Sequence, residues 1–515
     1  MQKPKLMFYN DSRHYSFYRY DPPMSLHQLR QPVDEILGTG VDTLSFGLAS
    51  GQTFLHDSQV GARWGEGVVE HNRGVMWWRA AENLKRALEV GHDPLRVVVE
   101  RAHEKGLQIL CSMRMNDAST AEAANLYMTN RLKLEHPEVM IGEEDPDNAH
   151  AATCMDFAHP LVRQERLRVI EEVCGRYGAD GLEMDPYVGV FFKRSEVEEN
   201  RPLMTEFVGE VRALLDRIGA ECGAELCLAT RAHPVEEANL RMGMDVRTWL
   251  EQGLVDLVVP FEGGFQINQE LDIDWLVEAA QSAGKWIYAP MGRVPYDDRN
   301  HEATIEMMRA AATNYRVAGA DGLYLADLEW PFADRQYAML REMADPDIYA
   351  RKKKHYFPAH KEAQEAVFAP RRYLPIELEE GVSAEVVFSV GDDLEAAQRD
   401  GELERATLGV RIVQYCQEDE IAFRFNGKML EPGRITHFYG GLVAYTASRS
   451  GLPERIDTHY WFHFDLPLDL LRQGQNELVV TPERIFAPLT SIRVLHQVEL
   501  EIEYREPFQT QGGQM

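Results

Sequence analysis

Residues 5–345 repeat one pattern, in which a short apolar segment is followed by a polar loop and then by an amphipathic stretch of helical period. The pattern predicts eight strands, over residues 6–11, 41–49, 107–117, 179–187, 226–233, 255–262, 286–291 and 321–327. Strands that alternate with helices in this way form parallel sheets, and eight repeats predict a closed (β/α)8 barrel. A doubly wound open sheet is the competing fold, but the chain has neither a GxGxxG after the first strand nor a Walker motif.

The fourth predicted strand, residues 179–187, reads A-D-G-L-E-M-D-P-Y. Its two-residue period predicts that Leu182 and Met184 face outward and that Glu183 and Asp185 face the barrel interior. Both acids then lie near the C-terminal end of the strand, where barrel enzymes keep their chemistry. The structural alternative is that Asp185 caps the following loop and that Glu183 pairs with an arginine. We expect a functional role, because two inward carboxylates on one strand are costly to bury.

The chain divides by pattern into a catalytic barrel over residues 1–345, a linker helix over 346–370, an all-β sandwich or jelly roll over 371–506 and a disordered tail over 507–515. Residues 50–78 and 118–156 are predicted insertions into the barrel. The lysine run at 352–354 is interpreted as a solvated surface. In the β-rich region, Asn426-Gly427 between two apolar runs predicts a tight hairpin turn.

The formal charge of −29, from 83 acidic and 54 basic residues, disfavours binding to nucleic acid or to an anionic membrane surface. The six cysteines form no CxxC or metal-binding spacing and are interpreted as buried free thiols. No apolar segment has the length of a signal core or a membrane span. A cytoplasmic protein is expected, or a periplasmic one if a signal peptide has been removed, and a homo-oligomer is left open.

Polar residues gather at the predicted C-terminal strand ends, beside aromatic residues that suit a polyhydroxylated substrate. Glycoside hydrolysis requires two carboxyl groups that flank the scissile bond, one as acid and the other as nucleophile or base. The catalytic candidates are Asp185, Glu262 and Glu183. The candidate substrate-binding residues are Asp11, Arg114, Asn116, Tyr187, Arg231, His233, Asp327 and Glu329. Candidate stacking residues are Tyr15, Tyr18, Trp77, Trp78, Tyr187 and Trp330.

A metal site is the chemical alternative. His233, Asp185, Glu262 and Asp327 together offer the mixed nitrogen and oxygen ligands that a divalent cation accepts. No HxH or HExxH spacing supports this set, and no GxSxG elbow supports a serine hydrolase. We therefore predict no metal and no cofactor.

The sequence D-G-L-E-M-D-P-Y, after a helix opened by D-F-A-H-P-L-V-R at residues 156–163, resembles the glycoside-hydrolase-like TIM barrels of bacterial polysaccharide degradation. These barrels carry a strand-four signature of the form D-G-(apolar)-x-(apolar)-D. Tyr187 stands at the position of the chitinase catalytic glutamate, which disfavours chitinase-type substrate-assisted chemistry. The seventh predicted strand has no acid, which disfavours the two-glutamate barrel enzymes, whose nucleophile lies on that strand. Acids after strands four and six, as in the alpha-galactosidase-like arrangement, are similar to Asp185 and Glu262. The β-rich region is similar to the accessory sandwich domains of such barrels.

The resemblance and the strand-end acids together predict a glycoside hydrolase that acts on an oligosaccharide or glycoside. The first rival is a non-catalytic carbohydrate-binding barrel whose acids only hold hydroxyl groups. The second is a metal-dependent lyase or isomerase of sugar acids, in which Arg114 and Arg231 clamp a carboxylate.

Overall fold

The computed structural model describes residues 2–49, 53–71, 73–116, 118–119, 127–128, 130–146, 148–261, 266–295, 300, 302–326, 328–358, 374–440 and 457–505. The chain forms two compact units. Unit 1 comprises Met1–Phe265, Asp272–Arg293 and Ala318–Ala344, and unit 2 comprises Gln266–Leu271, Val294–Val317 and Asp345–Met515.

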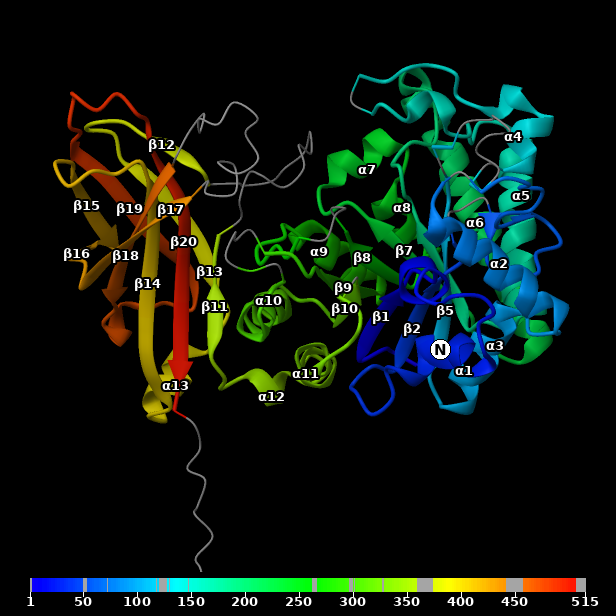
Figure 1. Ribbon diagram of the computed structural model, residues 1–515, viewed down its shortest axis with the longest axis horizontal. Helices are drawn as coiled ribbons and strands as arrows, with labels where there is room; N and C mark the ends of the chain where they lie inside the picture. Colours follow the sequence, from blue (N-terminus) through cyan, green and yellow to red (C-terminus); the bar gives the residue numbers. More distant parts are fainter. Residues whose placement is uncertain are drawn as a thin grey trace, which may run out of the picture. The chain divides into compact units, whose positions relative to one another are not determined.

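Unit 1 contains a closed barrel of eight parallel strands, which confirms the predicted (β/α)8 fold (Figure 1). The strands are β1 (Leu6–Asn10), β2 (Thr43–Gly47), β5 (Gln108–Arg114), β6 (Gly181–Asp185), β7 (Cys227–Ala232), β8 (Leu257–Pro260), β9 (Trp286–Met291) and β10 (Gly322–Ala326). Each strand pairs with the next in chain order, and β10 pairs with β1 to close the barrel. Two short strands, β3 (Thr53–Phe54) and β4 (Ala62–Arg63), pair with each other outside the barrel.

The helices of unit 1 follow the strands in the order that the periodicity predicts. They are α1 (Leu26–Asp34), α2 (Val75–Glu89), α3 (Pro94–Glu104), α4 (Arg131–Glu135), α5 (Pro160–Glu171), α6 (Val197–Cys222), α7 (Glu236–Met242), α8 (Val246–Glu251), α9 (Asp274–Ala283) and α11 (Asp334–Glu342). Single turns are η1 (Arg13–Phe17), η3 (Pro137–Val139), η4 (Ala151–Thr153), η5 (Glu172–Arg176) and η6 (Arg194–Glu196). Local chemistry sets several ends: Asp93 caps α3 by accepting from Leu95 N–H, and Gly223 ends α6 in a left-handed conformation.

The barrel interior alternates with the helix-facing layer at a period of two residues. Met7, Tyr9, Leu110, Ala229, Val259 and Tyr324 belong to one buried interior cluster. Gly322 makes room in this interior, because a Cβ atom there would lie 2.2 Å from the ring of Tyr288. The alternation turns Glu183 and Asp185 inward, as the sequence predicts, and Glu183 meets inward side chains of other strands.

An aspartate stands directly before every second strand, at the N-terminal end of the barrel. These residues are Asp42 before β2, Asp180 before β6, Asp256 before β8 and Asp321 before β10. Each carboxylate accepts a backbone N–H of the preceding barrel strand or of the residue just before it, with N···O distances of 2.9 Å for Lys5, 2.8 Å for Ile109, 3.0 Å for Leu228 and 2.9 Å for Ile287. The repeated G-A-D-G fragments at residues 178–181 and 319–322 therefore hold the strands in register.

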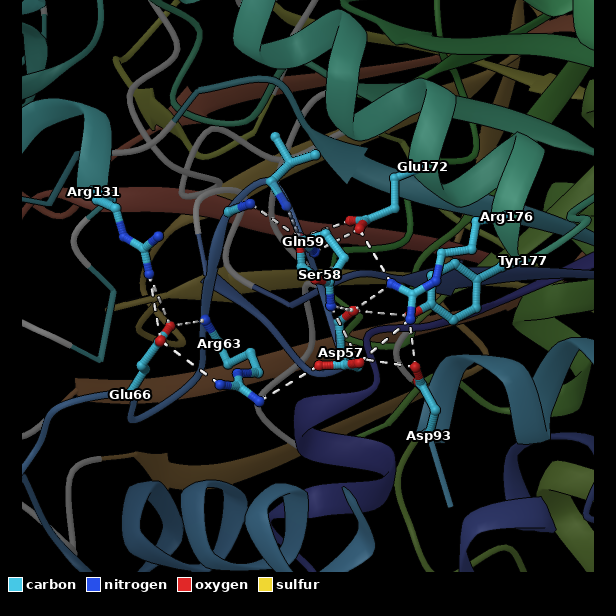
Figure 2. Close-up of polar contacts among 12 residues, drawn as sticks. Asp57, Ser58, Gln59, Arg63, Glu66, Asp93, Arg131, Glu172, Arg176 and Tyr177 are labelled. Carbon is cyan, nitrogen blue, oxygen red and sulfur yellow. Dashed lines mark hydrogen bonds and ion pairs between the residues drawn. The ribbon is translucent and has the colours of Figure 1, made fainter. Parts of the chain in front are cut away.

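The insertion after β2 is attached to the helix layer by a polar network (Figure 2). Glu172 accepts from Ser58 Oγ at 2.7 Å and from Gln59 N–H at 2.6 Å. Arg176 pairs with Asp57 at 3.3 Å, and the Tyr177 hydroxyl donates to Asp93 at 2.6 Å. The hydrogen bonds and the charge of His56 hold the pKa of Glu172 below its usual value, although burial alone would raise it.

Unit 2 contains two antiparallel sheets, which confirms the predicted sandwich (Figure 1, yellow to red). Its strands are β11 (Lys354–Tyr356), β12 (Ile376–Leu378), β13 (Ala384–Val390), β14 (Leu403–Val413), β15 (Glu420–Phe425), β16 (Lys428–Leu430), β17 (Arg434–Gly440), β18 (Asp457–Asp465), β19 (Gly474–Arg484) and β20 (Arg493–Tyr504). One sheet has the order β11-β20-β14-β18-β17 with β12 also on β20, and the other has the order β13-β19-β15-β16. Phe423 and Phe462, 5.0 Å apart between ring centroids, join the two sheets in one buried cluster.

The predicted hairpin turn at Asn426-Gly427 is confirmed. Phe425 pairs with Lys428, which leaves a two-residue loop with φ of 47° at Asn426 and 85° at Gly427. Positive φ at both positions is the requirement of the tight turn that fits the twist of two antiparallel strands.

Unit 2 also contains the helices α10 (Ile305–Val317), α12 (Pro346–Tyr349) and α13 (Leu394–Arg399), and the turn η7 (Leu468–Leu470). The Gln269 side chain donates to the backbone of Met307 and His355 and accepts from Phe357 N–H, which ties the segment Gln266–Leu271 to α10 and β11. The segment Gln266–Leu271 and α10 come from the stretch that the sequence assigns to the barrel, and β11 comes from the predicted linker.

The lysine run differs from its interpretation as a solvated surface. Residues 346–358 form the short helix α12 and the strand β11, and Lys354 is fully buried. Its ammonium group pairs with Asp392 at 2.8 Å and donates to two backbone carbonyls, which compensates the burial of the charge. Residues 359–370 of the predicted linker and the predicted tail at 507–515 lie outside the described residues.

All six cysteines are free thiols, as expected, but Cys222 is exposed and Cys416 is partly exposed, because they lie at a helix end and in a loop. Among the described helices, none is both long and apolar enough to cross a lipid bilayer.

Candidate functional site

Glu183 lies in the centre of the barrel interior and has no solvent-exposed surface. Its Oε1 atom accepts from Ser112 Oγ at 2.8 Å, from Arg231 Nε at 2.9 Å and from Tyr324 Oη at 3.0 Å. Its Oε2 atom accepts from Ser45 Oγ at 3.0 Å. Glu183 therefore holds Arg231 in place, and the catalytic role that the sequence suggests for it stays a prediction.

Arg231, on β7, connects the two acids of β6. Its Nη2 atom lies 2.8 Å from Glu183 Oε1, and its Nη1 atom donates to Asp185 Oδ2 at 3.4 Å. The guanidinium carbon also lies 4.2 Å from the ring centroid of Tyr9, and Nη2 donates to the Tyr324 hydroxyl at 2.7 Å. Arg231 is therefore fixed by its neighbours in a buried position, although the sequence predicts it as a substrate-binding residue.

Asp185 is the last residue of β6 and is 6% exposed. One oxygen accepts from Tyr187 N–H at 3.1 Å, and the other lies 3.4 Å from Arg231 Nη1 and 3.9 Å from Arg114 Nε. Both contacts of the structural alternative are therefore present: Asp185 caps its loop and Glu183 pairs with an arginine. Asp185 nevertheless differs from Glu183, because it stands at the strand end between two guanidinium groups.

Arg114 ends β5 and lies beside Asp185 and Tyr187, as the sequence predicts. Its guanidinium carbon is 3.9 Å from the ring centroid of Tyr187, which is 49% exposed. Burial acts to lower the pKa of Arg114, but the negative charge of Asp185 helps to raise it above its ordinary value. The Arg114 Nε atom is buried and has no hydrogen-bond partner in the described part of the chain.

The residues after β1 form a second charged group at the mouth. Asp11 accepts from the His14 N–H at 2.7 Å and contacts the His14 ring, and Arg13 Nη2 lies 3.9 Å from Asp11 Oδ2. Ser12, with φ of 60° and ψ of −42°, is the centre of a γ-turn closed by a 2.6 Å bond from Arg13 N–H to Asp11 O. Burial would raise the pKa of Asp11, but the bonds from His14 and the charge of Arg13 hold it below its usual value.

Three buried tyrosines separate these charges. Burial raises the pKa of Tyr9 and Tyr324 well above the ordinary range, against the opposing charge of Arg231. Burial likewise raises the pKa of Tyr18 to about 12, against the charges of Arg13 and Arg114. All three therefore stay neutral hydrogen-bonding groups at physiological pH.

Several predicted site residues lie in other roles or outside the described residues. Asn116 is fully buried, and its amide bonds the backbone of Met155 and Val190 at 2.8–2.9 Å, so it braces two loops. His233 accepts from Val235 N–H through Nδ1 at 3.0 Å, within the turn before α7. Glu329 is exposed. Glu262 and Asp327 lie outside the described residues, so their positions stay predictions.

The candidate stacking residues divide by exposure. Tyr15 and Tyr18 are buried, and Trp77 and Trp78 are half-buried on α2. Tyr187 and Trp330 are exposed, the latter with the Arg19 guanidinium 4.0 Å from its ring centroid. The exposed pair offers the ring faces on which a sugar could stack.

Sequence reasoning missed the partners that organise these charges. Ser112 and Tyr324 around Glu183, and Arg13 beside Asp11, were not among the candidates. The first two occupy inward positions of the strand period, but that period does not say which strands meet across a barrel. Arg13 follows a strained turn that no repeat in the sequence marks.

The four residues proposed as an alternative metal site include two outside the described residues. Within the described ranges, the structure has no cluster of three or more histidine, cysteine, aspartate or glutamate side chains able to hold a metal ion.

No protein-family model matches the sequence, and no curated protein matches it either. Solved structures that resemble the fold are glycoside hydrolases. They include the maltogenic alpha-amylase AmyB from Thermotoga neapolitana (10% identity, TM-score 0.39, covering 90% of this chain and 98% of that one). Alpha-L-fucosidase isoenzyme 2 from Paenibacillus thiaminolyticus is 14% identical with a TM-score of 0.41, and the match covers 68% of this chain and 49% of that one. The glycoside hydrolase domain of PelA from Pseudomonas aeruginosa is 15% identical with a TM-score of 0.34, and the match covers 63% of this chain and 95% of that one. Likenesses this low transfer no residue role to this chain.

Proposed function

We propose that the protein hydrolyses a glycosidic bond in an oligosaccharide or glycoside at the C-terminal mouth of the barrel. The observation that carries the proposal is the position of Asp185, an inward carboxylate at a strand end with Arg231 at 3.4 Å and Arg114 at 3.9 Å. Barrel enzymes carry out their chemistry at this end, whereas a carboxylate there without a substrate would only cost desolvation.

Asp185 acts in this mechanism as the nucleophile, or as the group that stabilises the oxocarbenium-like transition state. Two guanidinium groups lie beside its carboxylate. Proton transfer to the leaving oxygen then falls to a second carboxyl group, for which we propose Glu262, the first residue after Phe261 at the end of the β8 segment. Asp327, after β10, is the reserve candidate.

Glu183 acts as a positioning residue in this proposal. It fixes Arg231 through Nε and Nη2, and Arg231 in turn contacts Asp185. Tyr324 and the serines Ser45 and Ser112 keep Glu183 in place, so the orientation of Asp185 depends on a buried network rather than on a surface loop. We further propose that unit 1 carries the catalysis and that the sandwich of unit 2 has an accessory, structural role.

The test is a turnover screen of the full chain against neutral, acidic and sulfated oligosaccharides, with and without EDTA. We expect cleavage that survives EDTA and falls about 10²- to 10⁴-fold in both Asp185→Asn and Glu262→Gln. Arg217→Gln, on the exposed face of α6 where Arg217 pairs with Glu171 and Glu221, is the matched control and should keep full activity.

Other outcomes would replace the proposal. Full activity in both carboxyl variants contradicts the assignment of the pair. Activity that disappears with EDTA would favour the metal-dependent lyase or isomerase. A panel sugar that stabilises the protein against heat but is never cleaved would favour the carbohydrate-binding barrel.

A further inference from the structure

Two arginines at the mouth have guanidinium donors that the fold leaves unused. The Nε atoms of Arg13 and Arg114 are buried and have no hydrogen-bond partner in the described part of the chain. The Arg13 side chain is only 9% exposed and that of Arg114 is 17% exposed. A buried donor without a partner costs about 1–3 kcal/mol, and more when it is charged, so each such group calls for an explanation.

The nearest carboxylates do not explain them. Arg13 Nη2 is 3.9 Å from Asp11 Oδ2, and Arg114 Nε is 3.9 Å from Asp185 Oδ2, both beyond hydrogen-bond length. Asp11 is already bonded by His14, and Asp185 by Tyr187 N–H and Arg231. Arg231 makes the contrast clear, because it lies in the same barrel mouth with its donors bonded to Glu183, Asp185 and Tyr324.

Both arginines lie at the C-terminal end of the barrel. Arg13 follows β1 and Arg114 ends β5, and these two strands are the neighbours of β2. The γ-turn at Ser12 directs the chain so that Arg13 lies beside Asp11, and a turn of this kind is strained in a non-glycine residue. Each arginine has a carboxylate nearby, Asp11 or Asp185, but its Nε donor has no hydrogen bond among the described residues.

We propose that Arg13 and Arg114 form a subsite for the oxyanion group of an acidic sugar, next to Asp185. The planar guanidinium fork binds a carboxylate or a sulfate through two parallel bonds, which a neutral hydroxyl does not allow. The ring of Tyr187 supports Arg114 from one side, and the neutral hydroxyl of Tyr18 is hydrogen-bonded to the side chain of Arg13. That the bound sugar belongs to a cleavable glycoside rests on the proposed hydrolase function.

The charges at the mouth balance one another, so specific hydrogen bonds, and not general attraction, would hold a bound anion. Arg13, Arg114 and Arg231 balance Asp11, Glu183 and Asp185 in number, so the six described residues carry no net charge. Selectivity then comes from the unused donors and their geometry. Binding should consequently weaken less with salt than it would on a surface patch of lysines.

The experiment measures binding of D-glucuronate, D-glucose 6-sulfate and D-glucose to the full chain by titration calorimetry. We expect at least one acidic sugar to bind about tenfold or more tightly than glucose. Arg114→Met and Arg13→Met should each weaken that binding about ten- to hundredfold and leave the affinity for glucose unchanged. Arg217→Met is the control and should bind as the wild type does. The carboxylate and sulfate arms identify which oxyanion the subsite accepts.

Arg114→Lys keeps the charge without the fork and should bind the acidic sugar with intermediate affinity, which separates recognition from general attraction. Equal binding of all three sugars, or an acidic preference that survives in both methionine variants, overturns the inference. Arginine-dependent binding without cleavage of any panel glycoside supports the subsite and contradicts the hydrolase. Cleavage of neutral glycosides only, with equal binding of all three sugars, supports the hydrolase and contradicts the subsite.

Discussion

The two ends of the barrel use aspartate and basic residues in different ways. At the N-terminal end, the carboxylates of Asp42, Asp180, Asp256 and Asp321 all accept backbone N–H groups of a neighbouring strand or its first flanking residue. Three of them also pair with a basic side chain, such as Lys285 with Asp256 at 2.8 Å. At the C-terminal mouth, the Nε atoms of Arg13 and Arg114 are buried and have no hydrogen-bond partner among the described residues. Satisfied acids hold the strands in register at one end, whereas we propose that the unused donors at the other end bind a ligand.

A hollow of about 700 Å³ lies at the N-terminal end of the barrel. The partners of its charged groups tell more about its role than its size does. It is lined by Arg212, Asp216, Asp256, Lys285 and Trp286, among other residues. Its basic groups are ion-paired with its acids: Arg212 pairs with Asp216 at 2.7 Å and with Asp256 at 2.9 Å, although Arg212 Nε, like Arg114 Nε, has no hydrogen-bond partner among the described residues. We therefore assign this hollow to the stabilising end of the barrel and place the chemistry at the mouth.

The largest expected effect on stability follows from breaking the network under the mouth. Glu183→Gln removes the charge that compensates buried Arg231, so we expect unfolding to become easier by about 3–5 kcal/mol. Urea denaturation of the variant and the wild type measures this change. A loss below about 1 kcal/mol would mean that Glu183 does not anchor Arg231.

A smaller loss is expected at the opposite end. Asp256→Ala leaves the Leu228 N–H without its acceptor and separates Arg212 and Lys285 from their shared partner. We expect a cost of about 2 kcal/mol in unfolding free energy and unchanged turnover per folded molecule. If turnover falls while stability is retained, the two ends do not divide stability and function as described.

Glu35 is a buried carboxylate with one arginine partner, Arg19. The charge of that arginine does not offset the effect of burial on the pKa of Glu35. Burial raises its pKa from 4.5 to about 7, although Arg19 lies 3.3 Å away. The folded state thus binds the proton more tightly than the unfolded state, and stability from this group is lost as the pH rises from about 4.5 to about 7. The difference in unfolding free energy between wild type and Glu35→Gln should change across this window. A constant difference from pH 4 to pH 8 would contradict the raised pKa.

The smallest effect is expected at Lys3, whose ammonium pairs with Asp321 at 2.5 Å but whose side chain is 47% exposed. Lys3→Ala should cost less than about 1 kcal/mol, because exposed ion pairs are screened by water and salt. The backbone bond from Ile287 to Asp321 remains in this variant. The thermal midpoints of the two variants measure this difference. A shift in Lys3→Ala as large as that in Asp256→Ala would show that the basic side chain, and not the backbone hydrogen bond, stabilises this end of the barrel.

The barrel and the sandwich were predictable because they depend on periodicity. All eight strands lie within or close to their predicted ranges, and the two-residue period correctly turns Glu183 and Asp185 inward. The Asn426-Gly427 turn was predictable because it depends on two adjacent residues alone. Local signals of this kind survive folding unless tertiary packing opposes them.

The contacts within the site were less predictable, because they depend on how strands are staggered around the barrel. The sequence offered Arg114 and Arg231 as an equivalent pair of clamps, but Arg231 is bonded to Glu183 and Asp185. We propose Arg13 in its place, which a γ-turn at Ser12 brings beside Asp11. Lys354 shows the same limit, since an exposed lysine run and a buried ion pair with Asp392 look alike in sequence.

The most direct test makes the same substitution at both ends of the barrel and follows two quantities. Asp185→Ala and Asp256→Ala are compared with the wild type in turnover of a substrate found by the screen and in thermal midpoint. The account predicts that Asp185→Ala loses at least about 100-fold in turnover per folded molecule, beyond any change in midpoint, whereas Asp256→Ala lowers the midpoint and keeps its turnover per folded molecule. Turnover retained in Asp185→Ala would contradict the assignment of the chemistry to the C-terminal mouth.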